Sequence, residues 1–128
     1  MRKTYIVDSG VQNGSDTRFL LQEAPQELEV QAGGQLITDS DNHAFVYLMD
    51  VVDGYIYVQF PKTVWPLLAR SLEADKEPVL TWGQSEIQLD NFREELSMLI
   101  FNIEGNHNYG EEFSTAVEEA FKEQLSLS

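Results

Sequence analysis

The chain has 128 residues, a length typical of one domain, and the hydrophobic share of 42% is enough to fill a core and excludes a disordered chain. Its 22 acidic and 8 basic residues give a net charge of −14, which repels phosphate backbones and anionic membrane surfaces. Composition therefore predicts one domain over residues 1–128 that binds neither nucleic acid nor membranes, and whose charge suits a basic protein partner.

The absence of cysteine excludes disulfides, thiolate catalysis and cysteine-based zinc or iron–sulfur sites. The apolar run near the start of the chain is interrupted at Asp8 and is too short for a signal peptide, and no stretch is long enough to span a bilayer. We therefore expect a cytoplasmic protein.

The first half of the chain is punctuated like a β-meander. Three dipeptides suited to tight turns divide it into strand pairs: Asn13-Gly14 between 4–12 and 15–21, Gly33-Gly34 between 27–32 and 35–39, and Asp53-Gly54 between 44–52 and 55–60. Because short hairpin connections dominate, the sheet is predicted to be antiparallel.

The third hairpin predicts which side chains share a face of the sheet. A two-residue turn pairs Val52 with Tyr55, and side-chain alternation then forms a core face from Phe45, Tyr47, Met49, Val51, Ile56, Val58 and Phe60. The opposite face is too apolar for ordinary exposure, since it includes Val46, Leu48, Tyr55 and Tyr57. Helices covering both sides of the sheet are favoured, and the alternative is a second protein on this face, such as the other copy of a homodimer.

The second half is mostly helical. Thr63 is predicted to cap a helix through residue 74, and a short hairpin follows over 79–82 and 86–89. Asp90 is predicted to cap a second helix with a clean apolar stripe: Phe92, Leu96, Leu99, Ile100 and Ile103. Met98 and Phe101 lie beside this stripe, so burial on more than one side is expected.

A third helix follows a corner in the chain. Gly105 is expected to end the second helix, and Asn108 with Glu111 resembles a capping box that starts the last one, which extends to about residue 125. The predicted fold is therefore α+β, with an antiparallel meander of about six to eight short strands packed against three helices in the C-terminal half.

Two polar segments are candidate sites. Residues 39–43 start like a calcium loop, but Ala44 stands where that loop requires glycine, so a hairpin loop of backbone-bonding Asx residues is the favoured interpretation. Residues 104–111 could present His107 and Tyr109 for acid–base chemistry, although a helix–helix corner explains most of the segment. A ligand pocket formed by both segments would use Asp39, Asp41, His107 and Tyr109.

No catalytic residue, metal site or cofactor is predicted. The chain lacks GxSxG, GxGxxG and GxxxxGK[ST], and its two histidines, His43 and His107, are too far apart in sequence to indicate a shared metal. Whether the protein is an enzyme stays open at this point, with a binding role preferred.

Negative charge is concentrated late in the chain, with ten acidic and two basic residues from Glu86 to Glu123. On the last predicted helix, five carboxylates lie away from the apolar stripe: Glu111, Glu112, Glu118, Glu119 and Glu123. Glu119 and Glu123 repel each other at i,i+4 spacing, and a basic partner would relieve that cost. The same charge could equally serve only solubility.

Three segments carry a resemblance to a known family: residues 36–47 (LITDSDNHAFVY), 63–65 (TVW) and 102–113 (NIEGNHNYGEEF). They resemble the uncharacterised YjbL-type family of bacilli and staphylococci over about residues 36–121. The resemblance implies a small cytosolic protein of low-GC Gram-positive bacteria, and it implies no catalytic residues.

Three candidate functions are consistent with the sequence. The first is a non-enzymatic regulatory or adaptor-like protein whose acidic surface binds a basic protein partner. The second is a small-molecule binder or enzyme with a pocket near Asp39, Asp41, His107 and Tyr109. The third is an immunity or nucleic-acid-mimic protein, whose carboxylates would need phosphate-like spacing.

Overall fold

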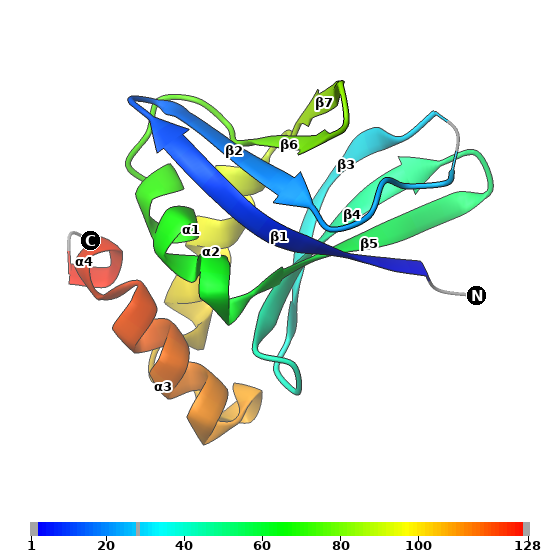
Figure 1. The fold of residues 1–128 in the computed structure, drawn as a ribbon. Coiled ribbons are helices and arrows are strands. Elements are labelled where there is room, and N and C mark those ends of the chain that lie inside the picture. Colours follow the sequence, from blue (N-terminus) through cyan, green and yellow to red (C-terminus); the bar gives the residue numbers. More distant parts are fainter. Residues whose placement is uncertain (1–2, 28, 127–128) are drawn as a thin grey trace.

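A computed structural model describes residues 3–27 and 29–126, and Figure 1 shows an α+β fold in which a curled sheet is joined to a group of helices. The strands are β1 (Lys3–Asn13), β2 (Asp16–Leu21), β3 (Gln31–Asp39), β4 (Ala44–Val51), β5 (Gly54–Pro61), β6 (Val79–Trp82) and β7 (Ser85–Gln88). The helices are α1 (Trp65–Ser71), α2 (Phe92–Ile103), α3 (Glu111–Ala120) and α4 (Lys122–Ser126), with 3₁₀ turns at Lys62–Val64 and His107–Tyr109. The predicted α+β class is confirmed.

The sheet is mixed, so the prediction of a purely antiparallel meander is wrong. Its order is β3-β4-β5-β1-β2-β6-β7, and the β1–β5 and β2–β6 pairs are parallel. Hairpin turns determine only the pairing inside each hairpin. Which hairpins lie side by side depends on burying Tyr5 of β1 and Phe19 of β2, which are at most 2% exposed. The long connections between the hairpins permit neighbouring strands to run parallel.

Gly33-Gly34 is not the predicted hairpin turn but a bulge within β3. The register between β3 and β4 shifts between Ala32 and Gln35, and Gly34 has a φ of 74°. A Cβ on Gly33 would lie 2.3 Å from the carbonyl oxygen of Leu48, so close backbone approach explains the glycine. The strand predicted over 27–32 contains Leu28, which lies outside the described residues.

The β4–β5 hairpin keeps the predicted faces with a different register. Val51 pairs with Gly54 and Phe45 with Phe60, a shift of two residues from the prediction. An even shift preserves which side chains share a face, because side chains alternate with a period of two. The predicted core face is therefore confirmed, with all its members at most 1% exposed except the half-buried Val51.

Within residues 3–27 and 29–126, helices on both sides of the sheet, the favoured prediction, are not observed. The core cluster joins helix residues to the inner side of the sheet and does not include Val46, Leu48, Tyr55 or Tyr57. The helices gather on that inner side (Figure 1). Val46 is nonetheless only 1% exposed within the single chain, while Tyr55 is 55% exposed. A homodimer through this outer face stays a prediction. Such a dimer would bury Tyr55 but almost nothing more of Val46.

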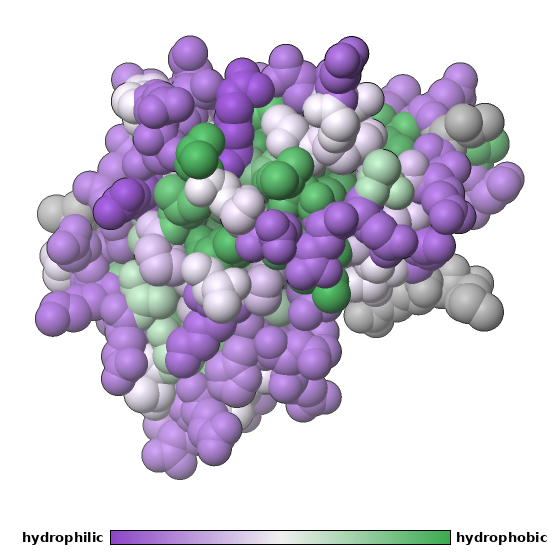
Figure 2. All heavy atoms as spheres, in the orientation of Figure 1, coloured by the Kyte–Doolittle hydropathy of each residue, from purple (hydrophilic) through white to green (hydrophobic). Residues whose placement is uncertain are grey.

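Figure 2 shows where hydrophobic side chains reach the surface over β1 and β2. The large apolar residues exposed on these two strands are Ile6, Val11 and Leu20. They lie on the outer side of the sheet, opposite the buried Phe19 and Leu21.

Helix ends differ from the predictions more than helix positions do. Thr63 lies in a 3₁₀ turn and caps nothing, and Asn91 rather than Asp90 precedes α2, with a φ of 64°. Gly110 rather than Asn108 precedes α3, and the last helix breaks at Phe121 into α3 and α4. Among the described helices, none is long and apolar enough to cross a membrane.

Candidate functional site

The loop between β3 and β4 is organised by its own Asx residues. The side chain of Asp39 accepts hydrogen bonds from the backbone N–H of Asn42 at 3.4 Å and from its Nδ2 at 2.8 Å. The backbone N–H of His43 donates to the carbonyl oxygen of Ser40 at 3.3 Å, and His43 takes a φ of 49°. The carboxylate of Asp39 therefore shapes the turn, as the hairpin-loop interpretation predicts.

The corner between α2 and α3 is organised by glycine and asparagine. Gly105, with a φ of 69°, follows the end of α2 as predicted. The side chain of Asn106 accepts a hydrogen bond from the backbone N–H of Asn108 at 3.0 Å. The backbone carbonyl oxygen of Asn106 accepts one from the hydroxyl of Ser114 at 2.8 Å. These bonds fix the path of the chain into α3.

The two polar segments lie side by side and form the His43 hollow. One part, of about 360 Å³, is lined by residues of both segments: Ser40, Asp41, His43, Tyr109, Gly110, Glu111, Glu112 and Phe113. The other part, of about 580 Å³, shares some of them and extends along α3: His43, Lys62, Glu111, Glu112, Thr115, Ala116 and Glu119. The His43 ring contacts the ring of Phe113, with centroids 6.1 Å apart.

The structure brings together only part of the predicted pocket. Asp41 and Tyr109 line the same hollow, whereas Asp39 and His107 line neither part. The sequence marks His43 as a candidate metal ligand but not as a pocket residue, yet His43 lines both parts of the hollow. Its signal in the sequence is its position at the end of the Asx-rich loop, directly before a buried strand.

The chemistry of the hollow is acidic and polar. Glu111, Glu112 and Glu119 face one cation, Lys62, among the lining residues. The described residues contain no group of three or more histidine or acidic side chains placed to hold a metal ion. The arrangement suits contact with a basic or hydrogen-bonding group of a ligand or partner.

The predicted acidic surface divides into exposed and bonded carboxylates. Glu111, Glu112, Glu119 and Glu123 are exposed, and we call these four the acidic patch. Glu118 is half-buried, and its Oε2 accepts from the backbone N–H of Gly105 at 2.8 Å. The single last helix predicted from the sequence is interrupted at Phe121, so Glu119 lies on α3 and Glu123 on α4.

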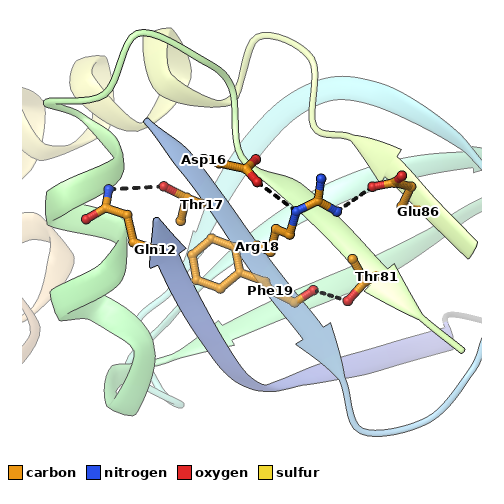
Figure 3. A network of polar contacts seen from close by, with 7 residues as sticks. All are labelled: Gln12, Asp16, Thr17, Arg18, Phe19, Thr81 and Glu86. Atoms are coloured by element: carbon orange, nitrogen blue, oxygen red, sulfur yellow. Dashed lines mark hydrogen bonds and ion pairs between the residues drawn. The ribbon is translucent and has the colours of Figure 1, made fainter. Parts of the chain in front are cut away.

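The ion pairs between described residues all involve Arg18, on the outer side of the sheet (Figure 3). Its Nε lies 2.9 Å from Asp16, and its guanidinium also pairs with Glu86 of β7. Hydrogen bonds to Asp16 and then to Glu86 raise the pKa of Arg18. This network joins β2 to β7 across β6, where Thr81 donates to the carbonyl oxygen of Phe19 at 3.1 Å. The charge of Arg18 is thus balanced by Asp16 and Glu86, whereas the carboxylates of the acidic patch have no ion pair with a described residue.

Burial is the main cause that raises the pKa values of two tyrosines, Tyr47 and Tyr5. Burial raises the pKa of Tyr47 to about 12, and its hydroxyl donates to the carbonyl oxygen of Asp90. Burial and a hydrogen bond to Glu27 raise the pKa of Tyr5, and that bond lowers the pKa of Glu27. Both hydroxyls stabilise the fold, and neither lines the His43 hollow.

Comparison with known proteins identifies relatives but no solved structure that matches. The chain is 41% identical over 126 residues to a UPF0738 protein of Lysinibacillus sphaericus, with 98% of this chain and 99% of that one covered. It is 39% identical to a relative in Geobacillus kaustophilus and 36% identical to one in Halalkalibacterium halodurans, each covered over its full length.

The expected membership of an uncharacterised family of bacilli is thereby confirmed, while the name YjbL and the staphylococcal members stay predictions. A family profile described as "Family of unknown function (UPF0738)" matches residues 5–121, which is most of the chain. The chain therefore belongs to the UPF0738 family.

Proposed function

We propose that this protein is a non-enzymatic, cytosolic binding protein, regulatory or adaptor-like, whose acidic patch holds a basic protein partner. The observation that carries the proposal is the state of the four carboxylates, which are exposed and form no ion pair with any described residue. Unpaired surface charge of one sign steers an oppositely charged partner to its place.

The surroundings of the patch support the same function. Three of its members, Glu111, Glu112 and Glu119, line the His43 hollow, so a partner side chain could insert next to them. Glu111 and Glu112 are also in the first turn of α3, where the positive end of the helix dipole stabilises carboxylates. These two carboxylates are therefore held in place on a folded helix.

The proposal is tested by removing the four charges and retrieving partners from a lysate of a related bacillus. The patch variant carries Glu111→Gln, Glu112→Gln, Glu119→Gln and Glu123→Gln. We expect one or more basic proteins to bind the unaltered chain at low salt, to bind less at high salt, and to be lost from the patch variant.

A matched variant with Asp8→Asn, Glu23→Gln, Asp53→Asn and Asp75→Asn removes four exposed charges elsewhere and controls for total charge. It should keep the partner. Equal loss from both variants would show non-specific attraction and overturn the proposal, as would the absence of any salt-sensitive partner. Recovery of a nucleic-acid-binding protein, released by DNA in competition, would instead favour the nucleic-acid-mimic alternative.

A small-molecule site is the second candidate, because Asp41 and Tyr109 do line one hollow together with His43. A ligand that binds only the folded chain raises its melting temperature. A screen of metabolites and metal ions should therefore give a shift that Asp41→Ala and Tyr109→Phe both reduce. No shift with any compound, or a shift unchanged in both variants, would remove this candidate.

A further inference from the structure

One side of α2 carries two large apolar side chains, Met98 and Phe101, that the other described residues leave largely exposed. Residues Glu94, Ser97, Met98, Phe101 and Asn102 follow one another at i, i+3, i+4, i+7 and i+8, so they form one continuous strip along the helix. Met98 is 51% exposed and Phe101 is 40% exposed. The sequence predicts both to be buried, and within this chain they are not.

The strip borders a groove made by three helices. The first hollow, of about 550 Å³, lies between the end of α1, α2 and α4: Leu72, Glu73, Arg93, Glu94, Ser97, Ile100, Phe101 and Gln124. A second hollow, of about 440 Å³, continues it on the other side of Phe101: Glu94, Ser97, Met98, Phe101 and Asn102. Because the hollows share Glu94, Ser97 and Phe101, they form one groove along α2, which we call the α2 groove.

The size and charge of the α2 groove favour a short segment of another protein over a second copy of this chain. A stable dimer buries about 800 Å² per partner, whereas only two large apolar side chains, Met98 and Phe101, are exposed along the strip. Two copies would also bring together net charges of −14 each. A short segment with a few apolar anchors fits the dimensions better.

The charges beside the α2 groove specify the segment further. Two carboxylates line the groove, that of Glu73 in the turn after α1 and that of Glu94 in α2. Oε2 of Glu73 also accepts a hydrogen bond from Nε2 of Gln124 at 3.0 Å. Arg93 is the one cation among the lining residues, and its Nε donates to the carbonyl oxygen of Ser71 at 3.0 Å, which holds its guanidinium toward α1. A segment with lysine or arginine on either side of its apolar stripe would complement these carboxylates.

We propose that the α2 groove binds a basic amphipathic helix of the partner protein, with its apolar stripe on Met98 and Phe101 and its basic side chains toward Glu73 and Glu94. This inference rests on the proposed function, since it specifies the partner's chemistry and adds a second contact surface to the acidic patch. An amphipathic helix in a groove is a common way for apolar anchors to add affinity to a charged contact.

The test follows the methyl groups of methionine by NMR. The chain has three methionines, of which Met98 is exposed and Met49 is fully buried, so Met49 is an internal control. The probe is a synthetic Leu/Lys peptide of about four turns with helical spacing, compared with a scrambled peptide of the same composition. We expect the helical peptide to shift the Met98 resonance and leave Met49 in place. Phe101→Ser should weaken binding by about tenfold.

Tyr55→Ser is the matched control, since it removes an exposed ring on the outer side of the sheet and should leave binding unchanged. Met98→Ser gives a second groove variant in case Phe101→Ser fails to fold. Equal affinity for both peptides, or an unmoved Met98 resonance, overturns the proposal that the α2 groove binds a helix. The proposed function survives that result if the patch variant still loses the basic partner in the lysate experiment. No binding of either peptide also overturns the groove, and the proposed function is then decided by partner recovery.

Discussion

Both sides of α2 carry large apolar side chains, but only those of the inner side are buried. On the inner side Phe92, Leu96, Ile100 and Ile103 are each 0% exposed, while on the outer side Met98 and Phe101 are about half exposed. Both sets are apolar and both lie on the same twelve-residue helix. The difference teaches that hydrophobic pattern predicts where a helix forms, while its neighbours decide which of its apolar residues are buried.

The inner side is also held by polar contacts with the sheet. The hydroxyl of Tyr47 donates to the carbonyl oxygen of Asp90 at 2.7 Å, just before α2 begins. The backbone N–H of Leu36 donates to Oε1 of Glu95 at 3.1 Å, and Nδ2 of Asn91 donates to the carbonyl oxygen of Gly34 at 3.2 Å. Packing and hydrogen bonds therefore act on the same side of the helix.

The largest expected effect comes from opening a cavity on the inner side. Leu96→Ala should lower the free energy of unfolding by about 2–5 kcal/mol, because the side chain is fully enclosed and the space it leaves cannot refill. Urea denaturation followed by circular dichroism measures the change. A loss below about 0.5 kcal/mol, the size typical of surface positions, would contradict the assigned inner side.

Tyr47→Phe should cost about 1–3 kcal/mol of unfolding free energy, since it leaves the N–H of Gly34 and the carbonyl of Asp90 without their partner. The effect depends on pH. Burial raises the pKa of Tyr47 from 10.0 to about 12, so its contribution is complete below pH 10 and is lost as pH rises toward 12. Urea denaturation from pH 8 to 11 should show the difference between the two proteins shrinking above pH 10. A difference that grows with pH would contradict this assignment.

Two neighbouring glutamates separate the hydrogen bond from the charge. Glu95→Ala should destabilise the fold by about 1 kcal/mol because it removes the acceptor for the N–H of Leu36, whereas Glu94→Ala removes the same charge from the exposed side and should change stability by less than about 0.5 kcal/mol. Thermal unfolding of both variants provides the comparison. Equal effects would show that helix charge, and not the contact with β3, matters at this position.

The smallest effect is expected on the outer side. Met98→Ser should change the free energy of unfolding by less than about 0.5 kcal/mol, since half of the side chain is already in water. A loss of about 2 kcal/mol or more would show that Met98 packs as a core residue, which would remove the basis of the α2 groove.

Much of the fold could be predicted from local pattern. Alternation along β4 and β5 gave the correct core face even though the register moved by two, because only an odd shift exchanges the faces. The apolar stripe of α2 and the glycine at its end were predictable for the same local reason. Gly33-Gly34 could not be distinguished from a turn, since a bulge and a turn both require glycine and differ only in the strand that lies opposite.

The candidate site could be predicted only in part. Sequence identified the two polar segments but not which of their side chains would meet. Asp41 and Tyr109 line the His43 hollow, while Asp39 hydrogen-bonds within its own turn and His107 lines neither part of the hollow. Such a choice depends on the relative position of two loops that are over sixty residues apart in the sequence.

The sequence by itself determined the α+β class, the absence of cysteine chemistry, the acidic charge and the inner faces of the hairpin and of α2, because composition and periodicity act locally. Only the tertiary structure decided the parallel β1–β5 and β2–β6 pairs, the meeting of the two polar segments and the exposure of Met98 and Phe101. Each of these depends on which distant surfaces bury one another, and that is a property of the whole chain.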